Sequence, residues 1–140
     1  MMGEEFISSS PSEEKRVEIR EMVLRSTYAF GKFVCGFGDL DPDIHGGMCR
    51  WIEGGGRFKL GIAPRGFFKT STWTLADGLR YATANPNSRT LLSNEIQDNA
   101  EKWIGLMQDV VMGPIYRWLD RKSTRLNSSH LKLSRMPSSA

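Results

Sequence analysis

The chain has 140 residues, of which 39% are hydrophobic and 25% are charged, and its formal net charge is +3. This length suffices for one domain with a hydrophobic core, and no apolar run approaches the roughly 18 residues of a membrane-spanning helix. Cys35 and Cys49 lack the CxxC spacing of a metal site, so we expect two reduced thiols in a soluble intracellular protein.

The N-terminal part of the chain predicts one long helix. Residues 1–9 are polar and acidic, so we expect neither a signal peptide nor an ordered start. Ser10 and Glu13 have the spacing of a capping box, and Pro11 suits the first helical position. We therefore expect a helix from about 11 to 34, because apolar residues recur there at helical spacing: Val17, Ile19, Met22, Val23, Phe30 and Phe33.

A second helix is predicted to begin at Pro42, with Asp41 as its N-cap, and to end at Gly54. Its expected apolar face consists of Ile44, Met48, Trp51 and Ile52. His45 is a lone histidine beside the start of this helix. A packing or surface role is its simpler interpretation, and contact with a nucleotide is the alternative.

The middle of the chain has the order strand, loop, helix, turn and strand. Residues 58–63 form a short apolar run typical of a buried parallel strand, and residues 70–84 suit a helix that packs on a sheet. Asn85-Pro86-Asn87 predicts a turn, and 89–93 a second strand. This order predicts the first half of a nucleotide-binding α/β unit. A further helix is expected from about residue 95 to Gly113, followed by an apolar cluster that ends at Leu119.

The last 21 residues resemble a translated sequencing adapter. Residues 120–130 read DRKSTRLNSSH, and one reverse translation of that string matches a common short-read adapter. A serine-rich disordered tail is the alternative. The segment 120–140 contains five basic residues and one acidic residue, a net charge of +4, so residues 1–119 carry −1 of the total of +3. We therefore expect a non-native tail, and its charge gives no indication of nucleic-acid binding.

The segment between the two expected strands has the features of a phosphate-binding loop. Such a loop needs converging backbone N–H groups, a helix N-terminus and a lysine that reaches the terminal phosphates. A hydroxyl after that lysine ligates Mg²⁺. Lys69 and Thr70 occupy these positions, but the glycines of the usual GxxxxGK[ST] pattern are replaced by Ala63 and Phe68. The alternative is a basic helix start whose lysine is only solvated.

The stretch LGIAPRGFFKTST…NPNSRTLLSNEIQDNAEKW resembles the ATPase domain of tailed-bacteriophage terminase large subunits. Many members of that family carry a deviant Walker A loop of the form PRGxxKS or PRGxxKT. Ser93, Asn94 and Ala100 match the strand and helix that follow this loop in the family. The resemblance covers residues 42–112, and the loop is its most specific part. It implies a truncated α/β fold, a partial P-loop NTPase of the RecA/ASCE type with a parallel sheet and a helical N-terminal extension.

The resemblance implies roles for the loop residues. Lys69 would bind the β- and γ-phosphates of ATP, Thr70 would hold Mg²⁺, and Arg65 would stabilise the γ-phosphate. An Arg65 that pairs with a surface acid is the alternative. The expected nucleotide-binding residues are Pro64, Arg65, Gly66, Phe67, Phe68, Lys69, Thr70 and Ser71, with Arg65 and Lys69 as the catalytic pair.

The whole protein would then be a genome-packaging motor that uses ATP to move double-stranded DNA into a capsid. By resemblance, its partners would be a portal protein and a small terminase subunit, and the intact motor would form a homo-oligomeric ring in the host cytoplasm. We expect a helical start at 1–41, a partial ATPase domain at 42–119 and the tail at 120–140. No Asp-Glu strand or nuclease acids follow, so the fragment is expected to be inactive. A helicase-like or chaperone-like ATPase and a non-catalytic helical interaction module are the alternatives.

Overall fold

The computed structural model describes residues 12–121 of the chain. The predicted disorder at 1–9, the predicted cap at Ser10 and Pro11, and the tail from residue 122 onward lie outside the described residues. Within them, no helix is both long enough and apolar enough to cross a membrane.

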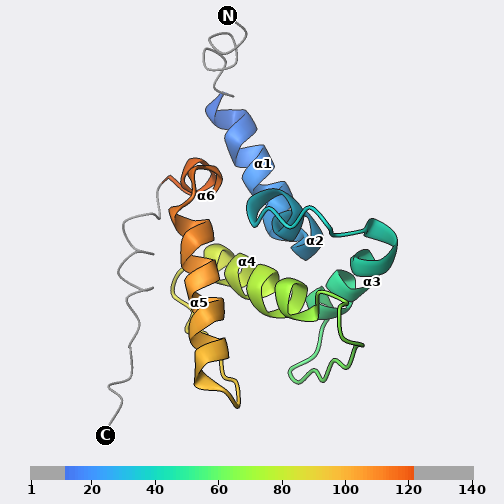
Figure 1. Cartoon of the computed structure of the whole chain (residues 1–140). Coiled ribbons are helices and arrows are strands. Elements are labelled where there is room, and N and C mark those ends of the chain that lie inside the picture. Colours follow the sequence, from blue (N-terminus) through green and yellow to red (C-terminus); the bar gives the residue numbers. More distant parts are fainter. Residues whose placement is uncertain (1–11, 122–140) are drawn as a thin grey trace, which may run out of the picture.

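The described part of the chain is built from helices (Figure 1). Two segments are π-helical, η1 (Phe30–Val34) and η2 (Thr70–Ala76). Segment η1 directly follows α2, and η2 directly precedes α4. The α-helices are α1 (Glu13–Arg25), α2 (Thr27–Ala29), α3 (Pro42–Glu53), α4 (Asp77–Ala84), α5 (Gln97–Met112) and α6 (Pro114–Leu119).

The predicted single helix over 11–34 is broken at Ser26. This residue has an extended backbone (φ −129, ψ 117), and its hydroxyl accepts a hydrogen bond from the Ala29 N–H at 3.3 Å. Serine favours such local bonds to the backbone over the helix interior, so Ser26 ends α1 and caps α2. Helix α1 itself begins at Glu13 with Ser12 as N-cap.

The start and end of α3 agree with the prediction, whereas its buried face does not. Asp41 caps the helix, since its carboxylate accepts hydrogen bonds from the N–H groups of Asp43 and Ile44 at 2.8 and 3.3 Å. The buried residues of α3 are His45, Gly46 and Cys49, while Ile44 and Trp51 of the predicted face are exposed. The helix is therefore turned so that its small and polar side chains face the rest of the protein.

The hydrophobic core lies where α1, η1, α4, α5 and α6 meet, with α4 running between α5 and α2 in Figure 1. The hydroxyl of the buried Tyr116 is hydrogen-bonded to Thr83 Oγ1 at 2.8 Å, so this large aromatic side chain is buried without an unpaired polar atom. The buried members of the core are Val23, Phe30, Val34, Leu79, Val111, Tyr116 and Leu119.

Polar contacts join α1 to the end of α6. The buried guanidinium of Arg16 donates a hydrogen bond to the Leu119 carbonyl at 2.9 Å. Asp120 is only 3% exposed, and its carboxylate lies 3.4 Å from the Arg20 guanidinium. The packed part of the described chain thus includes Asp120, and the predicted boundary between 119 and 120 stays a prediction.

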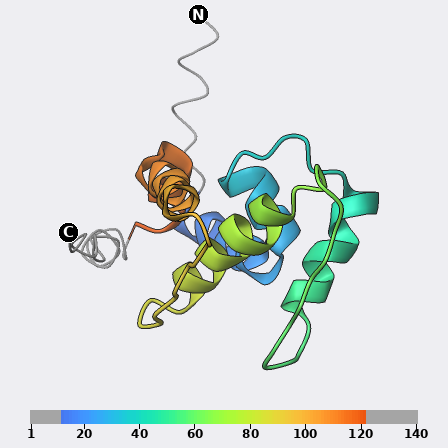
Figure 2. The ribbon, with the colours of Figure 1, turned by 60° about the horizontal axis from the view of Figure 1, so that its bottom comes forward.

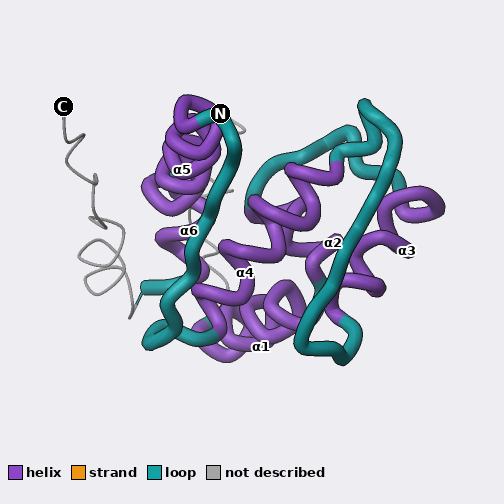
Figure 3. Tube along the Cα trace, turned by 90° about the horizontal axis from the view of Figure 1, so that it is seen from below, coloured by secondary structure: helices purple, strands orange, loops and turns teal. Residues whose placement is uncertain are grey.

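The predicted α/β fold with a parallel sheet is wrong for the described residues. No strand is formed within residues 12–121, and long loops occupy the places of both predicted strands, 58–63 and 89–93 (Figure 3). Four of their apolar side chains are exposed instead of buried: Phe58 87%, Leu60 83%, Ile62 87% and Leu91 88%.

The physical reason is that a strand obtains its backbone hydrogen bonds from a neighbouring strand, whereas a helix forms its bonds within one segment. No backbone–backbone hydrogen bond joins 58–63 to another part of residues 12–121. The two apolar runs have the composition of strands, but composition alone provides no partner, and an isolated pair of strands is at best marginally stable.

Candidate functional site

The candidate loop runs from the end of α3 to the start of η2. It leaves α3 at Gly54, turns back, and follows α3 in the opposite direction before it enters the next helix (Figure 2). The ammonium group of Lys59 fixes the beginning of this path, because it donates to the carbonyls of Ile52 and Gly54 and, at 3.3 Å, to that of Trp51. These are unsatisfied carbonyls at the C-terminus of a helix, where a cation is favourable.

The first arm of the loop packs against two tryptophans. Trp51 of α3 and Trp73 of η2 have ring centroids 5.1 Å apart, and Trp73 Nε1 donates to the Met48 carbonyl at 3.1 Å. Gly61 passes so close to them that a Cβ at this position would lie 2.4 Å from Trp73 Cζ3. Only glycine permits this approach, so the sequence at position 61 fixes how closely the loop follows α3.

The second arm of the loop has an unusual backbone. Gly66 has a φ of +90, and Phe68 has a φ of +49, in the left-handed region that residues with a Cβ rarely adopt. Lys69, the next residue, is right-handed helical (φ −60, ψ −40). Left- and right-handed residues in succession turn neighbouring backbone N–H groups to one side, which makes a concavity suited to an anion.

The side chain of Lys69 joins the end of the second arm to its beginning. Its ammonium donates to the Ala63 carbonyl at 2.6 Å and to the Pro64 carbonyl at 3.4 Å. Within residues 12–121 the ion pairs of the protein do not include Lys69. The positive charge of this side chain is therefore held at the loop by neutral carbonyl groups, and no carboxylate of residues 12–121 forms an ion pair with it.

The other predicted site residues are neighbours in this loop. Residues 64–68 are exposed, and Lys69, Thr70 and Ser71 are half-buried at the start of the helix formed by η2 and α4. Arg65 is exposed at the tip of the loop. The structure thus brings the eight predicted residues together on a loop that precedes a helix, but without a strand before it.

Two residues that hold the loop were missed as site residues in the sequence. Thr72 is buried, and its hydroxyl and N–H both donate to the Phe68 carbonyl, at 2.9 and 2.8 Å. His45, predicted to have a packing or surface role, is buried and contacts Phe68. Thr72 lies in the first turn of η2, four residues after Phe68 of the loop, and this spacing was its signal in the sequence. For His45, the signal was the alternative interpretation of contact with a nucleotide.

The helix that carries Lys69 is anchored by a polar cluster further along. The Asp77 carboxylate accepts from Thr27 Oγ1 at 2.9 Å and from the Arg80 guanidinium at 2.6 Å, and Arg80 also donates to the Leu24 carbonyl at 2.9 Å. These bonds fasten α4 to α1 and α2, so the loop projects from a helix that is fixed at its far end.

Among residues 12–121, neither cysteine belongs to a group of metal-binding side chains. Within the described residues there is no group of three or more His, Cys, Asp or Glu side chains that could hold a metal ion. Cys35 and Cys49 are free thiols. Burial raises the pKa of Cys35 to about 12 and that of Cys49 to about 11, so both thiols stay protonated at neutral pH and are poor nucleophiles.

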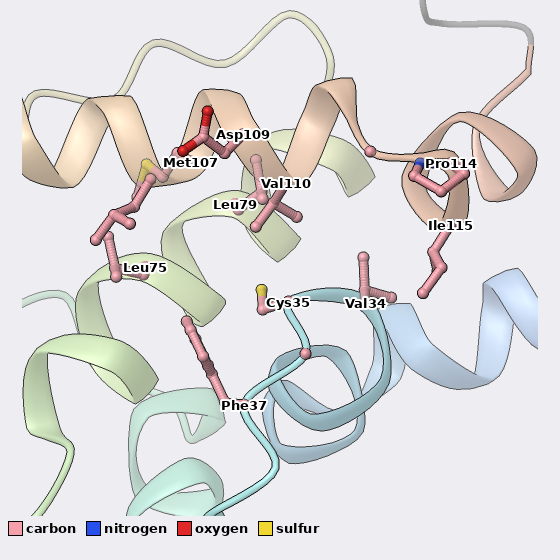
Figure 4. Close-up of a pocket in the computed structure, with 13 residues that line it drawn as sticks. Val34, Cys35, Phe37, Leu75, Leu79, Met107, Asp109, Val110, Pro114 and Ile115 are labelled. Atoms are coloured by element: carbon pink, nitrogen blue, oxygen red, sulfur yellow. The ribbon is translucent and has the colours of Figure 1, made fainter.

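An apolar cleft of about 390 Å³ lies between the η2–α4 helix, the end of η1 and α5 (Figure 4). Leu75 and Leu79 line it from that helix, Val34 and Cys35 from the end of η1, and Val110 from α5. Asp109 is the charged residue in its lining. Because the cleft offers few polar groups, it lacks the donors that a nucleotide phosphate needs, and we do not assign it to the loop.

Comparison of the chain with protein-family models, with curated proteins and with solved structures found no match.

Proposed function

We propose that residues 64–71 bind the phosphates of ATP, and that the chain belongs to the ATPase part of a viral DNA-packaging motor of the terminase large-subunit type. The observation that carries the proposal is the position of Lys69. Its ammonium lies on the carbonyls of Ala63 and Pro64, without a carboxylate partner among the described residues. A cation that is held at a loop but not neutralised attracts an anion.

The residues of the loop fit a nucleoside triphosphate with Mg²⁺. Lys69 would contact the β- and γ-phosphates, and the hydroxyl of Thr70 would ligate Mg²⁺. The exposed Arg65 would meet the γ-phosphate, where a guanidinium offsets the charge that develops during phosphoryl transfer. The left-handed residues Gly66 and Phe68 support a backbone cradle. Bound Mg²⁺ would supply charge neutralisation between the phosphate oxygens.

The role of the intact motor rests on the resemblance of the loop and of Ser93, Asn94 and Ala100 to the terminase family. In that role the whole protein would convert ATP hydrolysis into the movement of double-stranded DNA through a portal. It would act as a ring with a small terminase subunit in the host cytoplasm. The strand that precedes the loop in that family is not formed within residues 12–121, so the proposal rests on the loop and on the helix that follows it.

One observation favours a second function, that of a non-catalytic helical interaction module. Helices are the only regular secondary structure among the described residues, and the apolar side chains of Phe58, Leu60 and Ile62 are exposed at alternate positions of the loop. Exposed apolar groups of this kind mark contact surfaces. This alternative predicts that the protein has no affinity for nucleotide.

Calorimetric titration with ATP and Mg²⁺ separates the two functions. We expect Lys69→Ala to weaken ATP binding by about tenfold to a hundredfold, because a charge-assisted hydrogen bond contributes about 1.5–3 kcal/mol. Lys102→Ala is the matched control, since Lys102 is an exposed lysine of α5 outside the loop. Absence of ATP binding by the unmodified chain, or equal affinity in both variants, would overturn the proposal.

A further inference from the structure

The ring of His45 is fixed in one orientation. The residue lies in the first turn of α3 and is 5% exposed. Its Nδ1 accepts a hydrogen bond from the Asp41 N–H at 2.8 Å. A backbone N–H can only donate, so Nδ1 carries no proton. Asp41 in turn caps α3 through its carboxylate, and the two residues thus hold each other at the helix start.

This fixed ring meets the residue that precedes Lys69. The centroids of His45 and Phe68 are 5.5 Å apart with an interplanar angle of 81°, an edge-to-face pair. Phe68 has the left-handed φ of +49, which is unfavourable for a residue with a Cβ. Such a conformation persists only where the surroundings hold it. The ring contact holds the Phe68 side chain, and Thr72 holds its carbonyl.

We propose that His45 is a positioning residue for the phosphate loop and acts through Phe68. It keeps Phe68 left-handed and thereby sets the direction in which Lys69 leaves the loop. Helix α3 then holds the loop at two points. Lys59 of the loop binds carbonyls at the C-terminus of α3, and His45 near the N-terminus of α3 contacts Phe68. This inference rests on the proposed function of the loop.

The test is a double-mutant cycle on the full chain, with the affinities for ATP and AMP measured in the presence of Mg²⁺. His45→Asn keeps an acceptor for the Asp41 N–H and removes the ring. Phe68→Leu keeps an apolar side chain and leaves α3 untouched. We expect each variant to weaken ATP binding by roughly three- to tenfold, the worth of an edge-to-face pair, and to change AMP binding less. The double variant should bind ATP no more weakly than Phe68→Leu alone.

A merely structural role for His45 gives a different result. In that case His45→Asn would weaken ATP binding by the same factor with Phe68 and with Leu at position 68, and the inference would be overturned. Wild-type ATP affinity in Phe68→Leu would also overturn it, and this variant tests the inference even if His45→Asn does not fold. If Lys69→Ala weakens ATP binding but the variants at positions 45 and 68 do not, only the inference fails. If Lys69→Ala has no effect, the proposed function fails.

Discussion

Apolar side chains are buried in the packed helices but exposed in the loop that follows α3. In the packed region, Phe30 and Tyr116 are buried among α1, α4 and α6. In the loop, Phe58, Leu60 and Ile62 alternate with Lys59 and Gly61 as a strand would, yet all three are exposed. The alternate face of the loop contacts α3 and Trp73 through Lys59 and Gly61.

The difference in burial follows from where each region obtains its backbone hydrogen bonds. A helix forms its own hydrogen bonds, so its apolar stripe needs only another helix to be buried, and the described chain provides several. An extended segment leaves its N–H and C=O groups open until another strand pairs with them. The loop is therefore held by side-chain contacts at particular points, and its outer face is left in solvent.

The largest expected contrast between the regions concerns stability. Phe30→Ala removes a fully buried ring, which should lower the free energy of unfolding by about 3–5 kcal/mol. Leu60→Ala removes a side chain that is 83% exposed and should change it by less than about 0.5 kcal/mol. Urea denaturation followed by circular dichroism measures both. A loss of several kcal/mol in Leu60→Ala would show that residues 58–63 are packed in solution.

A smaller effect is expected where the loop touches the helices. The Cβ of Gly61→Ala would collide with Trp73, so we expect a loss of about 1–3 kcal/mol, the usual cost of overpacking. Gly47→Ala is the matched control, because Gly47 lies in α3 with open space around it. Alanine is a better helix former than glycine by up to about 1 kcal/mol, so this control should gain stability. Equal effects of the two variants in denaturation would contradict the close approach of the loop to Trp73.

The same contrast explains what the sequence could predict. Cap residues and helical periodicity are local, so Asp41, the helix after Lys69 and the stop at Gly113 were placed correctly. The strands at 58–63 and 89–93 were wrong, because strand formation depends on a partner elsewhere in the chain.

The candidate site also has a part that the sequence predicts and a part that it does not. Its eight residues are contiguous, so the sequence was sufficient to bring them together. The contacts that shape the loop come from other elements, and no short pattern reveals them. His45 reaches Phe68 only because α3 and the loop run in opposite directions side by side. The burial of His45 instead of Ile44 likewise depends on how α3 is turned in the fold.

The smallest effect concerns pH and the junction of α1 with α6, where Asp120 is buried. Burial raises the pKa of Asp120 above its ordinary value of 3.8, although Arg20 and Arg16 oppose the shift. A carboxyl whose pKa is higher in the folded than in the unfolded protein favours folding most when it is protonated. Its contribution is therefore full below the unfolded pKa and is lost as the pH rises through the folded pKa.

Asp120→Asn removes this titration and keeps a side-chain oxygen that can accept from Arg20. We expect the stability of the unmodified chain, relative to that of Asp120→Asn, to fall as the pH rises from about 3.5 to about 7. The other carboxylates titrate in both proteins and cancel in the difference, which is measured by urea denaturation at each pH. A relative gain by the unmodified chain would mean that the arginines outweigh burial, and that the junction is held by an ion pair instead of by packing.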